Sequence, residues 1–145
     1  MSNFRLRVYY EDTDFSGYVY HANYLKYCER ARSAYLRDVG VDQNAMFAEG
    51  HAFVVRKMDC EFLRPAKFDD VLDVETSLSE MSGARFELAQ TVKRGEELVF
   101  SAKVIVAIIG KDGRPQRISE NLKVVFAAGN SLLTKPPQHT SNAGL

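Results

Sequence analysis

The sequence predicts an α+β fold in which one long central helix packs against an antiparallel sheet of about five strands. A strand-like segment opens the chain, a single long helical segment follows, and four further strand-like segments come after it, separated by turn residues. A helix with one apolar stripe must bury that stripe. We therefore expect the sheet to wrap around this helix.

The spacing of apolar residues predicts the first strand and the long helix. Residues 4–11 alternate, which predicts a strand with Phe4, Leu6, Val8 and Tyr10 on its inward face. Residues 22–39 have the period of a helix. The stripe expected to be buried consists of Tyr24, Cys28, Ala31 and Tyr35. Leu25 and Leu36 flank it, and Gly40 is expected to end the helix. Asp42 is placed to cap a short helical turn over residues 42–49.

Beyond Gly50 the period changes to two. Segments 54–62, 72–79, 86–93 and 98–109 alternate between apolar and polar residues, and glycine-containing turns at 82–83, 94–96 and 111–113 separate the later ones. These features predict a long antiparallel meander. The last segment becomes apolar on both faces, so we expect it to be an interior strand or to be covered by a partner subunit.

The chain of 145 residues is expected to form one domain over residues 1–129. Residues 119–128 predict a terminal helix capped by Ser119, with a strand over 123–127 as the alternative. Residues 130–145 are rich in Ser, Thr, Asn, Pro and Gln, which predicts a disordered tail.

The amino-acid composition argues against nucleic acid and membrane insertion. The chain has 19 basic and 19 acidic residues, which gives no long-range attraction for nucleic acid, and no segment has the length or apolarity for membrane insertion. We expect a soluble, cytoplasmic protein whose Cys28 and Cys60 stay reduced. His51 and His139 have no companions at ligand spacing, so neither a metal nor another cofactor is expected.

The candidate site lies in the loop from Glu11 to His21, which joins the first strand to the long helix. The start of a helix carries unsatisfied N–H groups and about half a positive charge, which suits an oxygen that becomes an anion during reaction. Gly17 allows a tight turn and a close approach of substrate to the backbone. Asp14 supplies a carboxylate that can attack a carbonyl or activate water.

The string D-x-x-G-x-V-x-H, formed by Asp14, Gly17, Val19 and His21, and the segments "RVYYEDTD", "VYHANYLKYCERAR" and "AFVVRKMDCEFLRPAKFDD" resemble the 4-hydroxybenzoyl-CoA thioesterase family. The resemblance covers roughly residues 5 to 126. It is strongest to the Tol-Pal-associated, YbgC-like branch of acyl-CoA thioesterases. It implies the hotdog fold, and dimers that join sheets edge to edge, often pair into tetramers and place active sites at the subunit interface.

The resemblance also implies roles for particular residues. It assigns the catalytic carboxylate to Asp14 and the companion residues to Tyr10 and His21. It gives the backbone N–H of His21 the task of polarising the thioester carbonyl, and it places Gly17, Val19 and Tyr20 against the substrate. The acyl-CoA substrate is the implied partner, with acyl carrier protein as a second carrier of the acyl group.

The chemistry is consistent with these roles. A thioester releases the conjugate base of a thiol with a pKa of about 8.5, so hydrolysis does not require a serine nucleophile. Asp14 is ionised at neutral pH and can serve either as nucleophile or as general base, and the sequence leaves both routes open.

Alternative interpretations remain at this point. Taken alone, Asp14 is an ordinary turn residue, Tyr10 a core aromatic and His21 a helix cap. Arg56, Arg64 and Lys67 can meet coenzyme A phosphates, although solvated surface charge explains them as well. A dehydratase using His21 and Glu29 is disfavoured because eight helical positions separate them by ~12 Å. A noncatalytic acyl-CoA sensor or an envelope or lipid-synthesis scaffold is the alternative function.

Overall fold

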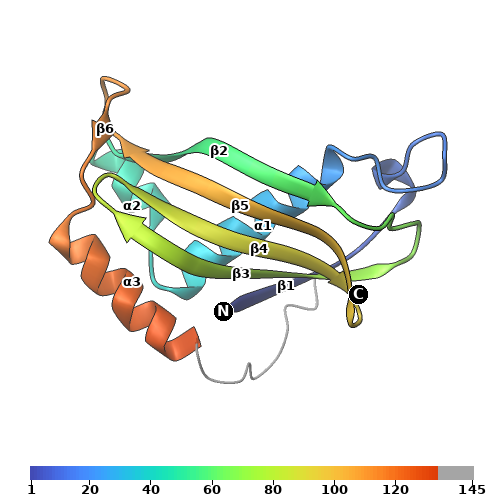
Figure 1. Ribbon diagram of the computed structural model, residues 1–145. Helices are drawn as coiled ribbons and strands as arrows, with labels where there is room; N and C mark the ends of the chain where they lie inside the picture. Colours follow the sequence, from blue (N-terminus) through green and yellow to red (C-terminus); the bar gives the residue numbers. More distant parts are fainter. Residues whose placement is uncertain (134–145) are drawn as a thin grey trace.

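The computed structural model describes residues 1–133 and shows a curved antiparallel sheet around one long helix (Figure 1). The strands are β1 (Ser2–Arg7), β2 (Ala52–Phe62), β3 (Val71–Ser82), β4 (Arg85–Arg94), β5 (Glu97–Ile109) and the two-residue β6 (Pro115–Gln116). The helices are α1 (Asn23–Asp38), α2 (Gln43–Ala48) and α3 (Glu120–Leu133), and a 3-10 turn, η1, spans Tyr10–Asp12. The predicted α+β class with a long central helix is confirmed.

The strand order is β1-β3-β4-β5-β2, with β6 paired to β5 and every pairing antiparallel. Strands β3, β4 and β5 form the predicted hairpins, and β5 is the predicted interior strand. The meander prediction is wrong for β2, which pairs with β5 at the far edge of the sheet and not with β3. Alternation along a strand shows which face is buried, but it does not show which strand lies beside it.

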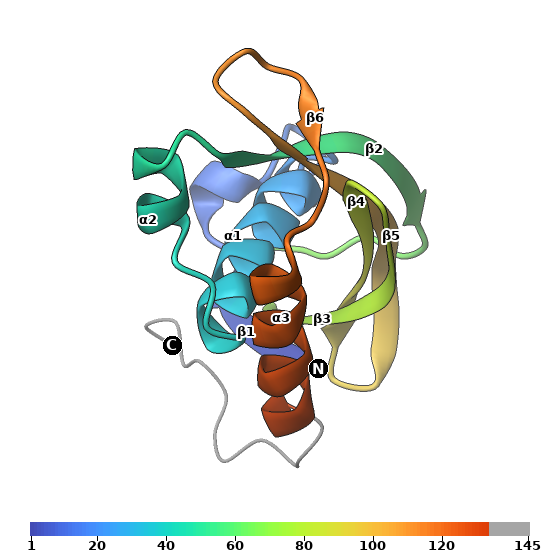
Figure 2. The ribbon, with the colours of Figure 1, turned by 90° about the vertical axis from the view of Figure 1, so that its left-hand side faces the viewer.

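The core lies between α1 and the concave face of the sheet, and Figure 2 shows the sheet curving around this helix. The predicted stripe is buried, and the Tyr24 ring stacks on Phe100 with ring centroids 5.1 Å apart. Helix α1 ends as predicted, because Gly40 takes a φ of 97° and the N–H of Val41 donates to the carbonyl of Leu36 at 2.8 Å. The apolar stripe therefore holds α1 against the sheet with its N-terminal end beside the candidate loop.

The first strand is shorter than predicted. Strand β1 ends at Arg7 and the chain turns into η1, which leaves Tyr10 79% exposed instead of inward. The Asp12 carboxylate accepts the N–H of Tyr9 at 2.8 Å, and the N–H of Asp12 donates to the carbonyl of Tyr9 at 3.0 Å. This local turn replaces strand pairing and ends the alternation.

Helix α3 is longer than predicted. Ser119 caps it by accepting the N–H of Leu122 at 3.1 Å, and the strand alternative for residues 123–127 is wrong. The helix continues through residues 130–133, where the sequence predicted a tail, and Asn130 accepts a hydrogen bond from the Tyr35 hydroxyl at 2.6 Å. The rest of the predicted tail lies outside the described residues. Among residues 1–133, no helix combines the length and apolar character that a membrane span requires.

Candidate active site

The loop before α1 is a tight turn that presents the Asp14 carboxylate. The N–H of Gly17 donates to the carbonyl of Asp14 at 3.0 Å, and the N–H of Asp14 donates to the carbonyl of Tyr18 at 2.9 Å. Gly17 takes a φ of 88°, a left-handed conformation that strains any other residue type. Thr13 and Val19 pair as an antiparallel bridge at the base of the turn. The loop is thus closed on itself, and Asp14 is the first residue of the turn at its tip.

Ser16 holds the Asp14 carboxylate. Both the N–H and the hydroxyl of Ser16 donate to Asp14 Oδ1, at 2.8 and 2.5 Å. These bonds lower the pKa of Asp14, and the nearby His21 lowers it further. Asp14 is exposed in the single chain, and the Ser16 bonds outweigh the upward effect of desolvation on its pKa. Its side chain is a carboxylate at neutral pH.

The start of α1 provides free hydrogen-bond donors. No side chain caps this helix, although the N–H of Asn23 donates to the carbonyl of Tyr20 at 2.8 Å. Within residues 1–133, the backbone N–H groups of His21 and Ala22 have no hydrogen-bond partner. Two unpaired donors therefore lie at the electropositive end of the helix, where they can bind a carbonyl oxygen.

Aromatic side chains surround the helix start. The His21 ring lies 4.6 Å from the Tyr20 ring and 6.0 Å from Phe62, the last residue of β2. Tyr10 stacks on Phe68 with centroids 4.2 Å apart, and both rings are exposed. The end of β2 and the loop that follows it therefore contribute apolar surface to the site, as the motif loop does.

The loop between β2 and β3 is held in place by α1. The backbone N–H of Ala66 donates to the Tyr24 hydroxyl oxygen at 3.1 Å, and the carbonyl of Ala66 accepts the N–H of Val19 at 2.8 Å. These two bonds join the loop to the helix and to the motif turn. They explain why Phe68, far away in sequence, stacks on Tyr10.

The structure brings most of the predicted site residues together. Asp14, Gly17, Tyr20 and His21 lie in one exposed loop at the start of α1. Tyr10 lies on the neighbouring turn, but its hydroxyl forms no hydrogen bond with Asp14 or His21. Val19 is only 6% exposed and packs in the core, so its side chain anchors the loop and does not face a substrate bound beside Asp14.

Sequence reasoning missed Phe62 and Phe68 as site residues and did not identify Ser16 as the partner of Asp14. The short Asp-x-Ser spacing was a usable signal for Ser16, because Asp side chains commonly accept the N–H two residues on. No comparable signal existed for Phe62 or Phe68. Their place depends on where β2 ends relative to α1, which is a tertiary property.

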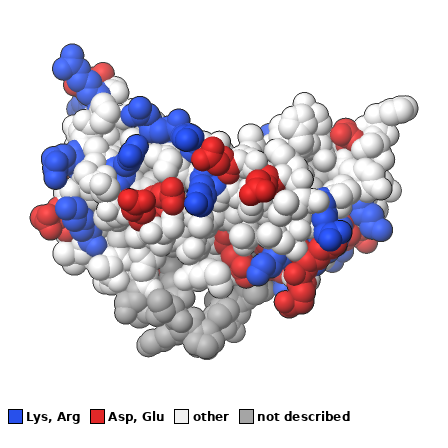
Figure 3. Space-filling view, viewed as in Figure 1, with Lys and Arg blue, Asp and Glu red and all other residues white. Residues whose placement is uncertain are grey.

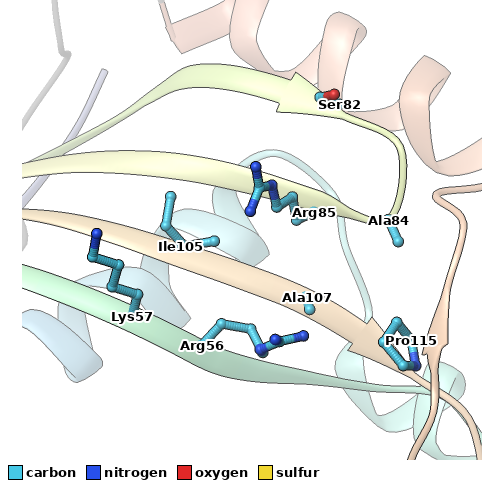
Figure 4. Close-up of a pocket in the computed structure, with 8 residues that line it drawn as sticks. All are labelled: Arg56, Lys57, Ser82, Ala84, Arg85, Ile105, Ala107 and Pro115. Atoms are coloured by element: carbon cyan, nitrogen blue, oxygen red, sulfur yellow. The ribbon is translucent and has the colours of Figure 1, made fainter.

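A hollow of about 360 Å³ lies on the convex face of the sheet, near the turn between β3 and β4 and beside β6. Figure 4 shows Arg56 and Lys57 of β2 and Arg85 of β4 around it, with Ile105 and Ala107 of β5 between them. The register shift between Val55 and Lys57 makes Arg56 a bulge residue, and the two consecutive cations project to the same face. Lys and Arg residues gather over this part of the surface (Figure 3). Arg56, Lys57 and Arg85 together form a cationic cluster suited to anionic groups.

Comparison with known proteins identifies the family. Residues 8–137 match the thioesterase-like superfamily. The chain is 44% identical over 105 residues to the acyl-CoA thioester hydrolase YbgC of Escherichia coli O6:H1, covering 72% of this chain and 78% of that protein. It is 41% identical over 127 residues to the acyl-CoA thioesterase YbgC of Haemophilus influenzae, covering 86% of this chain and 93% of that protein.

Solved structures of related proteins have the same fold as this chain. A probable thioesterase from Bartonella henselae superimposes with a TM-score of 0.76 at 44% identity, covering 81% of this chain and 98% of that chain. A protein from Aquifex aeolicus gives a TM-score of 0.81 at 29% identity, covering 87% of this chain and 99% of that chain. The chain therefore belongs to the hotdog-fold thioesterase-like superfamily and, within it, to the YbgC-related acyl-CoA thioesterases.

Proposed function

We propose that this thioester hydrolase cleaves acyl-CoA with Asp14 as its reactive carboxylate and with the free N–H groups at the start of α1 as its oxyanion site. The observation that carries this proposal is the pairing of an exposed, ionised Asp14 with unpartnered donors at His21 and Ala22. A thioester carbonyl placed between them has a nucleophile on one side and hydrogen-bond donors on the other. The chemistry requires no metal.

We take direct attack as the route, because the lowered pKa keeps Asp14 ionised, as a nucleophile requires, and makes it a weak general base at neutral pH. In this route a carboxylate oxygen of Asp14 bonds to the thioester carbon, and the coenzyme A thiolate leaves with the electron pair of the C–S bond. Water then cleaves the mixed anhydride, restores Asp14 and releases the free acid. The His21 side chain lies where it can orient that water.

A single turnover in ¹⁸O-labelled water tests the route. If Asp14 attacks and water then opens the anhydride at the aspartyl carbonyl, the acid released in the first turnover contains no label and Asp14 gains it. Label in Asp14 would establish the anhydride route, whereas label in the first product alone arises either from direct attack of water on the thioester or from opening of the anhydride at the acyl carbonyl.

Replacing Ser16 with Ala should move the acid limb of the pH–activity profile to higher pH. Activity requires ionised Asp14, and the Ser16 bonds lower the pKa of that group, so wild-type activity persists as pH falls below the ordinary carboxyl range. Losing the hydroxyl donor raises the pKa and brings the loss of activity to a less acidic pH. Ser79→Ala, which removes an exposed serine hydroxyl bonded to Glu87, is the control and should leave the profile unchanged.

We further propose that the working enzyme is a homodimer or homotetramer with active sites at the subunit interface. Tyr10, Phe15, Phe62 and Phe68 are exposed around Asp14, a larger apolar surface than a monomer usually leaves in water. Strand β2 is an uncovered sheet edge eleven residues long, which a second copy can extend. Such pairing would shield the carboxylate and the thioester from bulk solvent.

Sedimentation equilibrium of the full chain should give the mass of a dimer or a tetramer at the concentrations used for assay. Assay and sedimentation are run across the same dilution series, because activity should fall as the assembly dissociates. A monomer with full specific activity would remove the interface proposal while leaving the role of Asp14 intact.

A panel of acyl-CoA esters assayed with a thiol reagent tests the function itself. Release of free thiol identifies the hydrolase, whereas tight binding without release would support the noncatalytic sensor or scaffold, which the relatives do not favour. Including acyl groups carried on acyl carrier protein tests that second substrate. The cytoplasmic location stays a prediction from the sequence.

A further inference from the structure

Arg32 is a cation drawn into the core of the protein. It lies on α1, and its guanidinium donates to the side-chain oxygen of Gln90 on β4 at 3.0 Å. Gln90 is buried, and its amide donates in turn to the carbonyl of Cys28 at 3.0 Å and to the hydroxyl of Thr76 at 2.9 Å. A network of fully bonded neutral groups therefore fixes the position of one partly buried positive charge.

This charge has no acidic partner among the described residues. No carboxylate lies within 4 Å of the Arg32 guanidinium, in contrast to Arg5 and Arg94, each of which is paired with an aspartate. Partial burial lowers the pKa of Arg32, and Glu29, one turn earlier on α1, opposes that effect without forming an ion pair. Withdrawing a cation from water without a counter-ion is unfavourable, so a bound anion would stabilise this arrangement.

A cavity lies beside the guanidinium. It has a volume of about 170 Å³ between α1 and the sheet, and apart from Arg32, Glu29, Ser33 and Gln43 its lining is apolar. The apolar residues come from α1 and from three strands: Leu36, Phe53, Val54, Val55, Phe86, Leu88 and Val106. This largely apolar cavity holds Glu29 in its wall and the Arg32 guanidinium, which has no ion-pair partner there, so it suits a hydrocarbon chain whose terminal carboxylate bonds to Arg32.

Three exposed apolar side chains define the path that we consider between the helix start and this cavity. Leu25, Val55 and Phe62 are 39%, 47% and 53% exposed, although each belongs to α1 or to the β2 edge beside it. Phe62 contacts the His21 ring at one end of the path, and Val55 lines the Arg32 cavity at the other. Arg32 is eleven residues after His21, about 16 Å further along the helix axis.

We propose that the acyl chain of the substrate lies along this path and that Arg32 binds a carboxylate at its far end, which makes the enzyme selective for long-chain ω-carboxyacyl-CoA esters. This inference rests on the proposed function, because it assumes that the thioester carbonyl lies at the start of α1. Arg32 acts on specificity, and the bond-breaking step remains with Asp14.

The test compares ω-carboxyacyl-CoA esters with methyl-ended esters of the same chain length, across a series of lengths. Wild-type enzyme should favour the carboxylate-ended ester only when the chain is long enough to reach Arg32. In Arg32→Met the ratio of the two kcat/KM values should fall at least tenfold, about the worth of one hydrogen bond to a charged group. Arg32→Gln, which can keep the bond to Gln90 without the charge, should show the same loss and serves if the Met variant fails to fold.

A substitution at Glu29 should change the preference for carboxylate-ended esters in the opposite direction to the Arg32 variants. Glu29→Gln removes a negative charge from the cavity wall and should raise the preference for the carboxylate-ended ester, whereas a merely structural role for both residues would make both variants worse. Arg37→Met, an exposed arginine in the last turn of the same helix, is the matched control and should leave the ratio unchanged. Equal use of both esters by wild-type enzyme at every chain length would overturn the inference.

Two further measurements distinguish failure of the proposed Arg32 specificity from failure of the proposed thioesterase function. Binding of a free long-chain dicarboxylic acid, measured by calorimetry in wild type and in Arg32→Gln, needs no turnover, so Arg32-dependent binding in a chain that cleaves no thioester would refute the proposed function alone. Thioesterase activity without any Arg32-dependent selectivity would refute the inference alone. Sedimentation of the Arg32 variants completes the test, because dissociation of the assembly with an unchanged ester ratio would show that the cation pairs with a second subunit.

Discussion

Replacing Asp14 with Asn should lower kcat for acyl-CoA hydrolysis by about two to four orders of magnitude. The amide has no negative charge, so it can neither attack the thioester carbon nor accept a proton from water. The fold should not change, because Asp14 is exposed and an amide oxygen can still accept the two hydrogen bonds from Ser16. Steady-state kinetics and thermal unfolding of the same preparation measure both expectations.

Glu11→Gln is the matched control for this experiment. Glu11 is an exposed acid three positions before Asp14 and has no hydrogen-bond or ion-pair partner through its carboxylate within residues 1–133. Its neutralisation changes the local charge by the same amount, so kcat should remain within about twofold of wild type, the scale of a few tenths of a kcal/mol for an exposed charge. Comparable losses in both variants would mean that local potential, and not a reactive group at position 14, supports turnover.

Replacing Gly129 with Ala should destabilise the protein by roughly 1–3 kcal/mol. A Cβ atom at this position would lie 2.3 Å from the carbonyl oxygen and 2.4 Å from the Cα of Val39, where α3 crosses the end of α1. Since these are backbone atoms, α3 itself must move. That movement strains the contact between Phe126 and Phe86 and the hydrogen bond from Tyr35 to Asn130. Urea unfolding of both proteins gives the difference in free energy.

The sign of the change in unfolding free energy shows whether α3 packs closely on α1. In an ordinary helix interior, Gly→Ala stabilises by about 0.5–1 kcal/mol, so a variant more stable than wild type would show that α3 does not pack on α1 as described. Ala128→Ser is the control, because Ala128 is exposed on the same helix, and it should cost no more than about 0.5 kcal/mol.

Helix α1 and most of the strands could be predicted because periodicity records burial. Tyr24, Cys28, Ala31 and Tyr35 are buried as the helical spacing predicts, and Gly40 ends the helix in the left-handed conformation that favours glycine. The place of Asp14 beside the helix start also followed from the sequence. Strand, glycine turn and helix are consecutive in the chain, so local geometry alone brings the carboxylate near the free N–H groups.

Long-range contacts decided the rest. The terminal helix was predicted to end at residue 128, yet Gly129 lies inside α3, where it allows close contact with Val39. Tyr10 read as an inward strand residue, yet a local turn closed by Asp12 brings it to the surface beside Phe68. A single sequence states each residue's preference but not its distant neighbour, and both the place of Gly129 and the stacking of Tyr10 on Phe68 depend on such a neighbour.

The sequence by itself therefore determined the class of fold, the long buried helix and a carboxylate at that helix's electropositive end. Only the tertiary structure decided that β2 forms the sheet edge, that Phe62 meets His21, and that Arg32 stands without a counter-ion beside an apolar cavity. The physical reason is that hydrogen-bonded turns and apolar periodicity act over a few residues. Strand order and the pairing of a buried charge depend instead on which distant surfaces meet when the core closes.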